Sequence, residues 1–222
     1  LEFSKNFNID PSKLKKKIIN IDHHLAHAAS SVFPSGFDNT NYITIDGFGD
    51  FLSTTIGFYD GKKFNKINEV QFPHSLGLFY TAITQYLGFK NYGDEYKVMG
   101  LAPYGKPTFF DQMQDIVSFN SNKLFNLNLK YFVHHDKGLE MSWLDGKPTI
   151  SDVYSEKLKS LLGPERSHKD EISQIHKNIA ASTQKIFESI LFDVLNLLYE
   201  NNKNNNLCIS GGCGMNSVAN GK

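Results

Sequence analysis

Two histidines, His23 and His27, are four residues apart at the start of a segment rich in alanine and serine. On a helix capped by Asp22 they share one face, with Cβ atoms about 6 Å apart, so both imidazoles can reach one transition metal. A carboxylate is a natural third ligand, and we expect Asp46, after a predicted strand, to supply it. A histidine-rich helix start without metal is the alternative. His24 lies about 100° around the helix, where it would support a ligand or face solvent.

Asp46 also opens the sequence DGFGD at residues 46 to 50, a glycine-rich acidic turn between two predicted strands. Gly47 and Gly49 allow a tight turn and can present N–H groups to an anion or a hydrated metal. An ordinary hairpin turn is the alternative, because Asp-Gly is a common hairpin signal.

A second glycine-rich loop, SGGCGMN at residues 210 to 216, follows an apolar strand and precedes a helix. The amides of Gly211 and Gly212 could meet a phosphate or the edge of a nucleotide at the helix start, with Asn216 beside them. The loop is neither a G-x-G-x-x-G fingerprint nor a P-loop. A tight strand-to-helix turn, with Asn216 as its cap, is the alternative.

Three charged residues are candidates for contacts with substrate. Glu95 and Lys97 lie in the loop GDEYKVMGLAPYGKP, where they could bind ribose hydroxyls and a phosphate or carboxylate, unless the loop is simply solvated. Arg166 is the only arginine, and its guanidinium could grip a phosphate or adenylate oxygen in a bidentate way. An ordinary surface salt bridge is the alternative for Arg166.

The order of predicted elements is that of an α/β fold. Three antiparallel strands and a long helix, followed by a strand, a Gly-Gly loop and a helix, suit one lobe of an actin-like or ribonuclease-H-like ATPase. The hydrophobic periodicity predicts a strand at 18–21, a helix after residue 22, three strands between 41 and 72, helices at about 75–87, 108–118, 151–162 and 172–201, a short helix within 93–107, one or two strands within 123–135, and a strand at 207–210.

Composition narrows the class of protein. Lys+Arg and Asp+Glu both number 23 in 222 residues, so no charge excess indicates a nucleic acid or anionic membrane partner. Neither a membrane-spanning apolar run nor a leader is visible, and the two cysteines exclude a disulfide framework, so we expect a cytoplasmic protein. The first residue is Leu1 and the last lies in a predicted helix, so we expect a piece of a longer protein.

Five ordered blocks resemble the carbamoyltransferase family of nodulation and antibiotic-tailoring enzymes. They cover most of the chain, and the match is weakest between about residues 108 and 160. The blocks are DHHLAHAASSVFPSGFD, TIDGFGD, FPHSLGLFYTAITQYLGF, EYKVMGLAPYGKP and CISGGCGMNSVANGK.

The resemblance implies an actin-like (ASKHA) domain related to the tRNA threonylcarbamoyl-transfer protein. Residues 1–222 would form an internal part of that domain, without its amino-terminal segment and the carboxy-terminal adenylate-forming domain. The family's metal, usually iron, would bind His23, His27 and Asp46. The family's adenosine contacts would fall on Gly211, Gly212 and Asn216.

The implied activity is ATP-dependent transfer of a carbamoyl group from carbamoyl phosphate, through carbamoyl adenylate, to a hydroxyl of a small molecule or sugar. Asp136, after the pair His134 and His135, is our candidate for the base, and we expect the fragment alone to be inactive. The alternatives are a relative of the tRNA threonylcarbamoyl-transfer protein and a non-catalytic nucleotide-binding module. The FPHSLG block argues against the first, and retention of three metal ligands argues against the second. A homodimer is left open.

Overall fold

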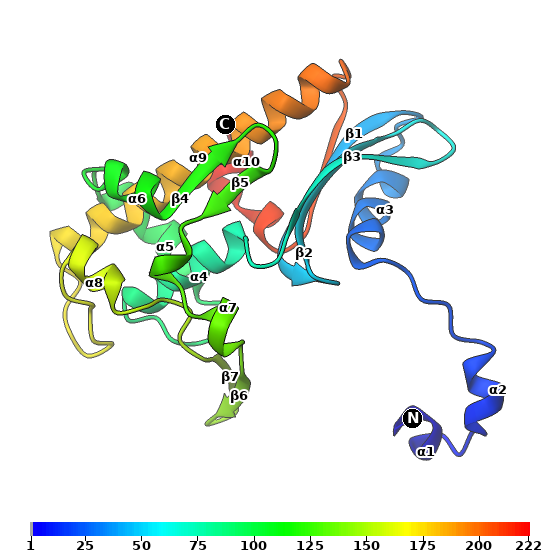
Figure 1. Cartoon of the computed structure of the whole chain (residues 1–222), viewed down its shortest axis with the longest axis horizontal. Helices are drawn as coiled ribbons and strands as arrows, with labels where there is room; N and C mark the ends of the chain where they lie inside the picture. Colours follow the sequence, from blue (N-terminus) through cyan, green and yellow to red (C-terminus); the bar gives the residue numbers. More distant parts are fainter. Residues whose placement is uncertain (1) are drawn as a thin grey trace.

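A four-stranded mixed sheet forms the centre of the fold in the computed structural model, which describes residues 2–222 (Figure 1). Its strands are β1 (Thr40–Gly49), β2 (Leu52–Tyr59), β3 (Phe64–Gln71) and β8 (Leu207–Ser210), in the order β3-β2-β1-β8. The first three are antiparallel, whereas β8 runs parallel to β1. The predicted three-stranded antiparallel unit and the strand at 207–210 are confirmed.

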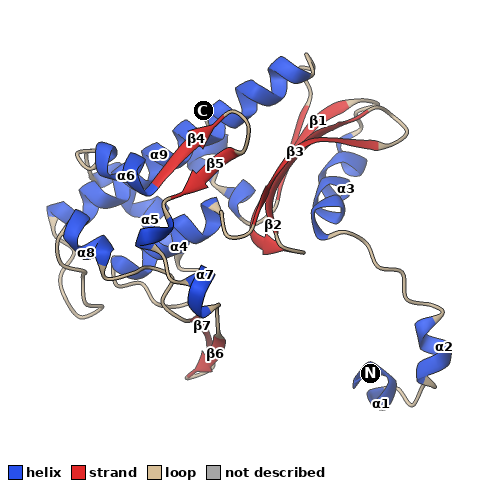
Figure 2. Cartoon of the chain, viewed as in Figure 1, coloured by secondary structure: helices blue, strands red, loops and turns tan. Residues whose placement is uncertain are grey.

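Helices cover both faces of the sheet (Figures 1 and 2). Helix α3 (His23–Ser35) lies on one face, and α4 (Leu76–Tyr86) and α9 (Gln174–Asn201) contact β1 from the other. Side chains alternate along a strand, so Ile43 and Ile45 enter the main core on the α4 side. Tyr42 instead joins Ala28 and Val32 of α3 in a smaller cluster.

Local signals set the helix boundaries. Helix α3 begins where the Asp22 carboxylate accepts a hydrogen bond from the Leu25 amide, and it ends at Gly36 with a φ of 75°. Helix α4 begins after Ser75, whose hydroxyl accepts from the Leu78 amide. The predicted helices after residue 22, at about 75–87 and at 172–201 are therefore confirmed within two residues.

The remaining elements are short. The amino-terminal helices lie away from the body of the chain (Figure 1), and the segment from 95 to 120 packs against α9. The elements are α1 (Glu2–Asn6), α2 (Pro11–Lys15), α5 (Glu95–Leu101), η1 (Ala102–Tyr104), α6 (Phe110–Ile116), β4 (Val117–Asn120), β5 (Leu124–Leu127), η2 (Leu129–Tyr131), α7 (His134–Lys137), β6 (Met141–Leu144), β7 (Lys147–Ile150), α8 (Lys157–Leu162), η3 (Cys213–Met215) and α10 (Ser217–Asn220).

Two sequence predictions about elements were wrong, and one hairpin was missed. Residues 18–21 form no strand, because no neighbouring strand pairs with them, and Ile19 is 83% exposed. The helix predicted at 151–162 starts only at residue 157, since Tyr154 first forms a β-bridge with Phe132. The hairpin of β6 and β7 was not predicted, although Asp145 and Gly146 supply the positive φ angles of a tight turn. Within residues 2–222, no helix is both long and apolar enough to span a membrane.

Candidate metal centre and adjoining pocket

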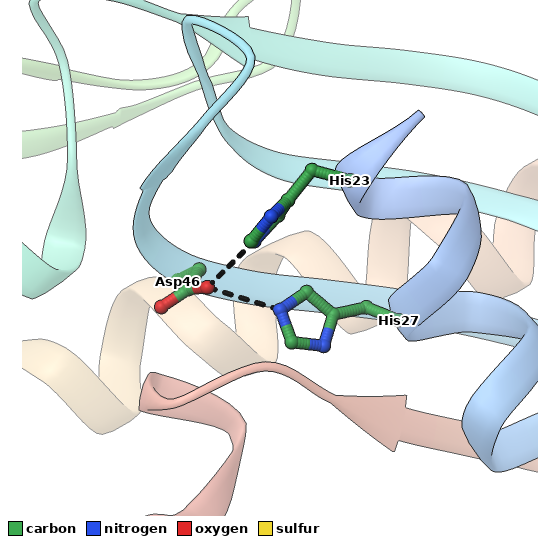
Figure 3. Close-up of side chains that lie close together, drawn as sticks. All are labelled: His23, His27 and Asp46. Carbon is green, nitrogen blue, oxygen red and sulfur yellow. Dashed lines mark hydrogen bonds and ion pairs between the residues drawn. The ribbon is translucent and has the colours of Figure 1, made fainter. Parts of the chain in front are cut away.

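His23, His27 and Asp46 converge at one point (Figure 3). Nε2 of His23 and Nε2 of His27 each lie 3.0 Å from the same oxygen of Asp46, Oδ2. One potential ligand atom from each residue lies within 4.8 Å of the others. The sequence prediction that these three side chains meet is confirmed, and two imidazole nitrogens with one carboxylate oxygen are a donor set suited to a transition metal.

The alternation of β1 explains why Asp46 meets α3. Tyr42 and Thr44 point toward α3, and Asp46 follows two residues later on the same face. The histidines come from the first turn of α3, whose His23 amide donates to the Asp50 carboxylate at 2.8 Å. Strand β1 extends to Gly49. The turn that follows is formed by Asp50 and Phe51, which both have positive φ angles, and not by the whole DGFGD sequence.

The environment of Asp46 favours its ionised form. Burial acts to raise the pKa of the carboxyl group, but hydrogen bonds from His23, the Gly47 amide and His27 outweigh it, so the pKa lies below its usual value. An ionised carboxylate facing two imidazoles is the protonation state that a metal ion requires of these ligands. The residues present therefore fit a divalent transition metal.

His24 lies between α3 and the sheet. It is 2% exposed, its Nδ1 is 2.7 Å from the hydroxyl of Thr44, and its Nε2 is 3.0 Å from the carbonyl oxygen of Leu52. Burial lowers the pKa of this imidazole below its ordinary value. The alternative that His24 faces solvent was wrong, because these two contacts fix the helix that carries the candidate ligands.

A pocket of about 380 Å³ adjoins the metal centre. Asp46 and Gly47 form one wall, and the loop after β8 forms another through Gly212 and Asn216. Ser75 at the start of α4 fixes the backbone next to Asp46, because its hydroxyl donates to the Gly47 carbonyl oxygen at 2.7 Å. The other lining residues are Gly77, Leu78, Tyr80, Thr81, Tyr92, Gly93, Glu95, Tyr96, Met99, Ile150, Phe187, Cys213 and Met215.

Two of the predicted loop glycines do not line this pocket. A Cβ at Gly49 would lie 2.0 Å from Cδ2 of His23, so this glycine lets the histidine ring approach the strand. Gly211 has a φ of 90°, and a Cβ there would lie 2.2 Å from the carbonyl oxygen of Ile45. Both glycines are required by close packing. That their amides face a ligand stays a prediction.

Of the predicted charged contacts, only Glu95 lines the pocket, where it accepts a hydrogen bond from Thr81 at 2.6 Å. Lys97 forms an ion pair with Asp94 at 2.7 Å and is absent from the pocket wall. The loop is thus partly a surface loop and partly a wall of the pocket.

Arg166 does not reach the pocket wall either. Its side chain is buried, and its guanidinium donates to the carbonyl oxygens of Leu87 at 2.7 Å and Asp170 at 3.1 Å. The guanidinium also stacks over the Phe89 ring at 5.3 Å. The surface salt bridge considered for Arg166 is therefore wrong, because the buried side chain ties residues 166–170 to the end of α4. This placement does not support Arg166 as a phosphate ligand.

Asp136 lies in a separate hollow beside Lys130 and Glu156. Its side chain is 79% exposed and pairs with His135 at 3.4 Å. This placement does not support Asp136 as the base for chemistry at Asp46. His134 is buried, with Nε2 2.8 Å from the Pro73 carbonyl oxygen.

Sequence reasoning missed most of the apolar wall of the pocket. Tyr80 and Phe187 read as core positions of their helices, and Tyr92 and Tyr96 read as parts of a surface loop. Only their approach to the Gly-Gly loop in space makes them one site. Spacing along the chain carries no signal for such an arrangement.

The chain that carries this candidate metal triad, the Gly-Gly loop and the mixed sheet belongs to the carbamoyltransferase family. The family model described as Carbamoyltransferase N-terminus matches residues 6–222. The nodulation protein NolNO of Sinorhizobium fredii is 32% identical over 219 residues, 96% of this chain and 28% of its own length. The nodulation protein NolO of Bradyrhizobium diazoefficiens is 32% identical over 208 residues, 91% of this chain and 33% of its own.

An uncharacterized protein of Synechocystis is 38% identical over 203 residues, 90% of this chain and 31% of its own length. The chain therefore spans about a third of the length of the relatives it matches.

Proposed function

We propose that this chain is the metal- and adenylate-binding part of an ATP-dependent O-carbamoyltransferase. The enzyme would convert carbamoyl phosphate and ATP to carbamoyl adenylate, with release of inorganic phosphate and pyrophosphate. It would then pass the carbamoyl group to a hydroxyl of a small molecule or sugar, with release of AMP. The observation that carries the proposal is that Asp46 belongs both to the metal triad and to the wall of the pocket. A molecule bound in the pocket would therefore present one end to the metal centre.

The metal ligands would be His23, His27 and Asp46. Two imidazoles and a carboxylate on one side of an ion leave coordination positions free, and iron is the metal we propose. When bound, the metal would act as a Lewis acid that polarises the carbamoyl oxygen. The protein's part is to hold the triad in place, which Thr44 does through His24 and Asp50 does through the His23 amide.

The pocket would hold the adenylate. Gly47 and Gly212 leave room beside Asp46 because they have no side chains, so a phosphate could approach their backbone amides. Glu95, fixed by Thr81, is suited to accept hydrogen bonds from ribose hydroxyls. The apolar wall would cover the flat faces of the adenine.

The fold is consistent with an actin-like domain. In one lobe of such a domain we expect an antiparallel unit whose first strand also pairs with a parallel strand, and helices on both faces of the sheet. Strands β1, β2 and β8 have this arrangement. We propose that the adenylate is made in another domain of the longer protein, and that residues 1–222 do not catalyse transfer alone.

The experiment uses the intact protein with carbamoyl phosphate, ATP and a panel of sugar, aminoglycoside and lipo-oligosaccharide acceptors. Pyrophosphate release reports adenylate formation, and AMP release together with a carbamoylated product reports transfer. We expect the double variant H23A/H27A to retain pyrophosphate release and to lose AMP release. Transfer at the wild-type rate in that variant would contradict the proposal.

A nucleotide-binding module without catalytic activity would give a different result. It would bind ATP but release neither pyrophosphate nor a carbamoylated product with any acceptor. A relative of the tRNA threonylcarbamoyl-transfer protein would instead modify adenosine in RNA and leave the hydroxyl acceptors unchanged.

A further inference from the structure

A hydrogen-bond network lies behind the wall of the pocket and is centred on Gln184 of α9. The Gln184 side chain is 4% exposed and faces Asn216, the last residue of the SGGCGMN loop. Nε2 of Gln184 donates to Oδ1 of Asn216 at 3.0 Å, and Nδ2 of Asn216 donates to Oε1 of Gln184 at 3.0 Å. The two amides therefore form a reciprocal pair.

The orientation of the Gln184 amide is fixed by groups outside the pair. Its Nε2 also lies 3.0 Å from Oε1 of Glu188, a carboxylate that can only accept while it is ionised. Lys222 forms an ion pair with the other oxygen of Glu188 at 2.5 Å. The buried hydroxyl of Tyr80 donates to Oε1 of Gln184 at 2.9 Å. All four hydrogen-bonding positions of the Gln184 amide are thus occupied.

The orientation of the Asn216 amide is fixed independently. The backbone amide of Ala219, which can only donate, lies 2.9 Å from Oδ1 of Asn216. Both lone pairs of Oδ1 are therefore used, by Ala219 and by Gln184. One N–H of Nδ2 is used by Gln184, so a single N–H of Asn216 is left for the pocket that this residue lines.

We infer that Gln184 and Glu188 are positioning residues that, together with the Ala219 amide, leave Asn216 able only to donate a hydrogen bond, and never to accept one, toward the molecule in the pocket. The ligand atom beside Asn216 must then be an acceptor, such as a ring nitrogen of adenine or an oxygen of ribose or phosphate. This inference rests on the proposed function for the class of ligand. To the proposed function the inference adds the donor–acceptor direction of one contact with the ligand, and the two residues that help to set this direction.

The test measures AMP binding to the intact protein by calorimetry, because AMP carries the adenylate part of the proposed ligand. In Gln184→Glu, the atom facing Glu188 and Oδ1 of Asn216 becomes an acceptor, so the amide pair is broken at pH 8. We expect at least about a tenfold loss of AMP affinity relative to wild type at that pH.

The pH profile separates positioning from mere packing. At pH 5.5 a proton on the carboxylate introduced by Gln184→Glu, or shared between it and Glu188, can replace the lost donor. We therefore expect the AMP affinity of this variant at pH 5.5 to lie close to that of wild type, with most of the loss seen at pH 8 recovered. Loss that is equal at pH 5.5 and pH 8, or no loss at either, would overturn the inference. So would a wild-type protein that binds no AMP.

Glu188→Gln provides a second variant in case Gln184→Glu does not fold. Glu188 does not line the pocket, yet its neutral isostere no longer forces Nε2 of Gln184 to face it. We expect a three- to tenfold loss of AMP affinity in this variant, on the order of one hydrogen bond. Unchanged affinity in a folded Glu188→Gln protein would overturn the inference.

Thr183→Val is the matched control, because Thr183 is buried on the same helix and donates to the Ile179 carbonyl in the helix backbone at 2.9 Å. AMP affinity should not change in this control. AMP affinity that is unchanged in all of these variants would overturn the inference. If metal content and carbamoyl transfer are still lost in H23A/H27A, the proposed function stands.

Discussion

A Cβ atom at Gly49 would lie 2.0 Å from Cδ2 and 2.5 Å from Nε2 of the His23 ring. The candidate ligand thus rests directly on the backbone of the strand that carries Asp46, and any side chain at position 49 must displace it. Gly47, two residues earlier, has no atom within 4 Å of the equivalent position. The two glycines of one motif therefore have different physical roles.

Gly49→Ala should lower the metal affinity of the intact protein at least about tenfold, because His23 cannot keep its position beside Asp46. Competition with a chelator, followed by elemental analysis, measures this affinity. Gly47→Ala is the matched control and should retain metal. Equal retention by both variants would show that the ring of His23 is free to move without loss of the site.

Arg166→Lys should destabilise the fold by about 1–3 kcal/mol without changing metal content or AMP binding. A lysine cannot reproduce the bonds to Leu87 and Asp170 or the stacking on Phe89, so buried carbonyl oxygens lose their donors. Urea unfolding measures the change. Lys62→Ala, at an exposed position, should lie within about 0.5 kcal/mol of wild type. A loss of AMP binding in folded Arg166→Lys would restore Arg166 as a ligand contact.

Much of the fold follows from local signals that the sequence shows. The cap at Asp22 and the alternation along β1 are properties of a few adjacent residues, and the helix starts near residues 22 and 75 were predicted within two residues. The meeting of His23, His27 and Asp46 was also predictable, because the spacing of the histidines places both rings on one helical face and a carboxylate is the natural third ligand.

The remainder depends on contacts between distant segments. The polar face of α9 reads as an ordinary surface, and only the packing of the SGGCGMN loop against it turns Gln184 into a partner of Asn216. Asp136 and Arg166 were chosen for their chemistry, but chemistry alone does not place a side chain. Asp136 pairs with its sequence neighbour His135, and Arg166 donates to the Leu87 carbonyl oxygen, so both side chains make structural contacts.

Stability should fall as the pH is lowered below about 6.5, the ordinary pKa of histidine. Burial lowers the pKa of His74 and of His134 in the folded state, and His74 must keep a lone pair on Nδ1 to accept from the Leu127 amide at 3.1 Å. The unfolded chain therefore takes up protons first, so stability is complete above about pH 6.5 and is lost as the pH falls toward the folded-state pKa values.

Thermal unfolding between pH 5 and pH 7.5 measures this dependence. His74→Asn keeps an acceptor near the position of Nδ1 but does not titrate, so its melting temperature should vary less with pH. The same change of melting temperature with pH in wild type and variant would exclude His74 as a source of the pH-dependent stability.

Cys213 should react slowly with iodoacetamide at pH 8, although it lines the pocket. Burial, with smaller contributions from Asp46 and Glu95, raises the pKa of its thiol to about 12, so the thiolate is scarce at that pH. Mass spectrometry of the labelled native protein, with Cys213→Ser to assign the site, measures the rate against that of a free thiol. Labelling as fast as the free thiol would contradict this environment.

Metal analysis of the intact protein, purified without oxygen, measures whether His23, His27 and Asp46 hold a metal. We expect about one iron per chain in wild type, and none in the H23A/H27A variant with its fold intact. An equal metal content in wild type and variant, or no transition metal in either, would contradict this expectation.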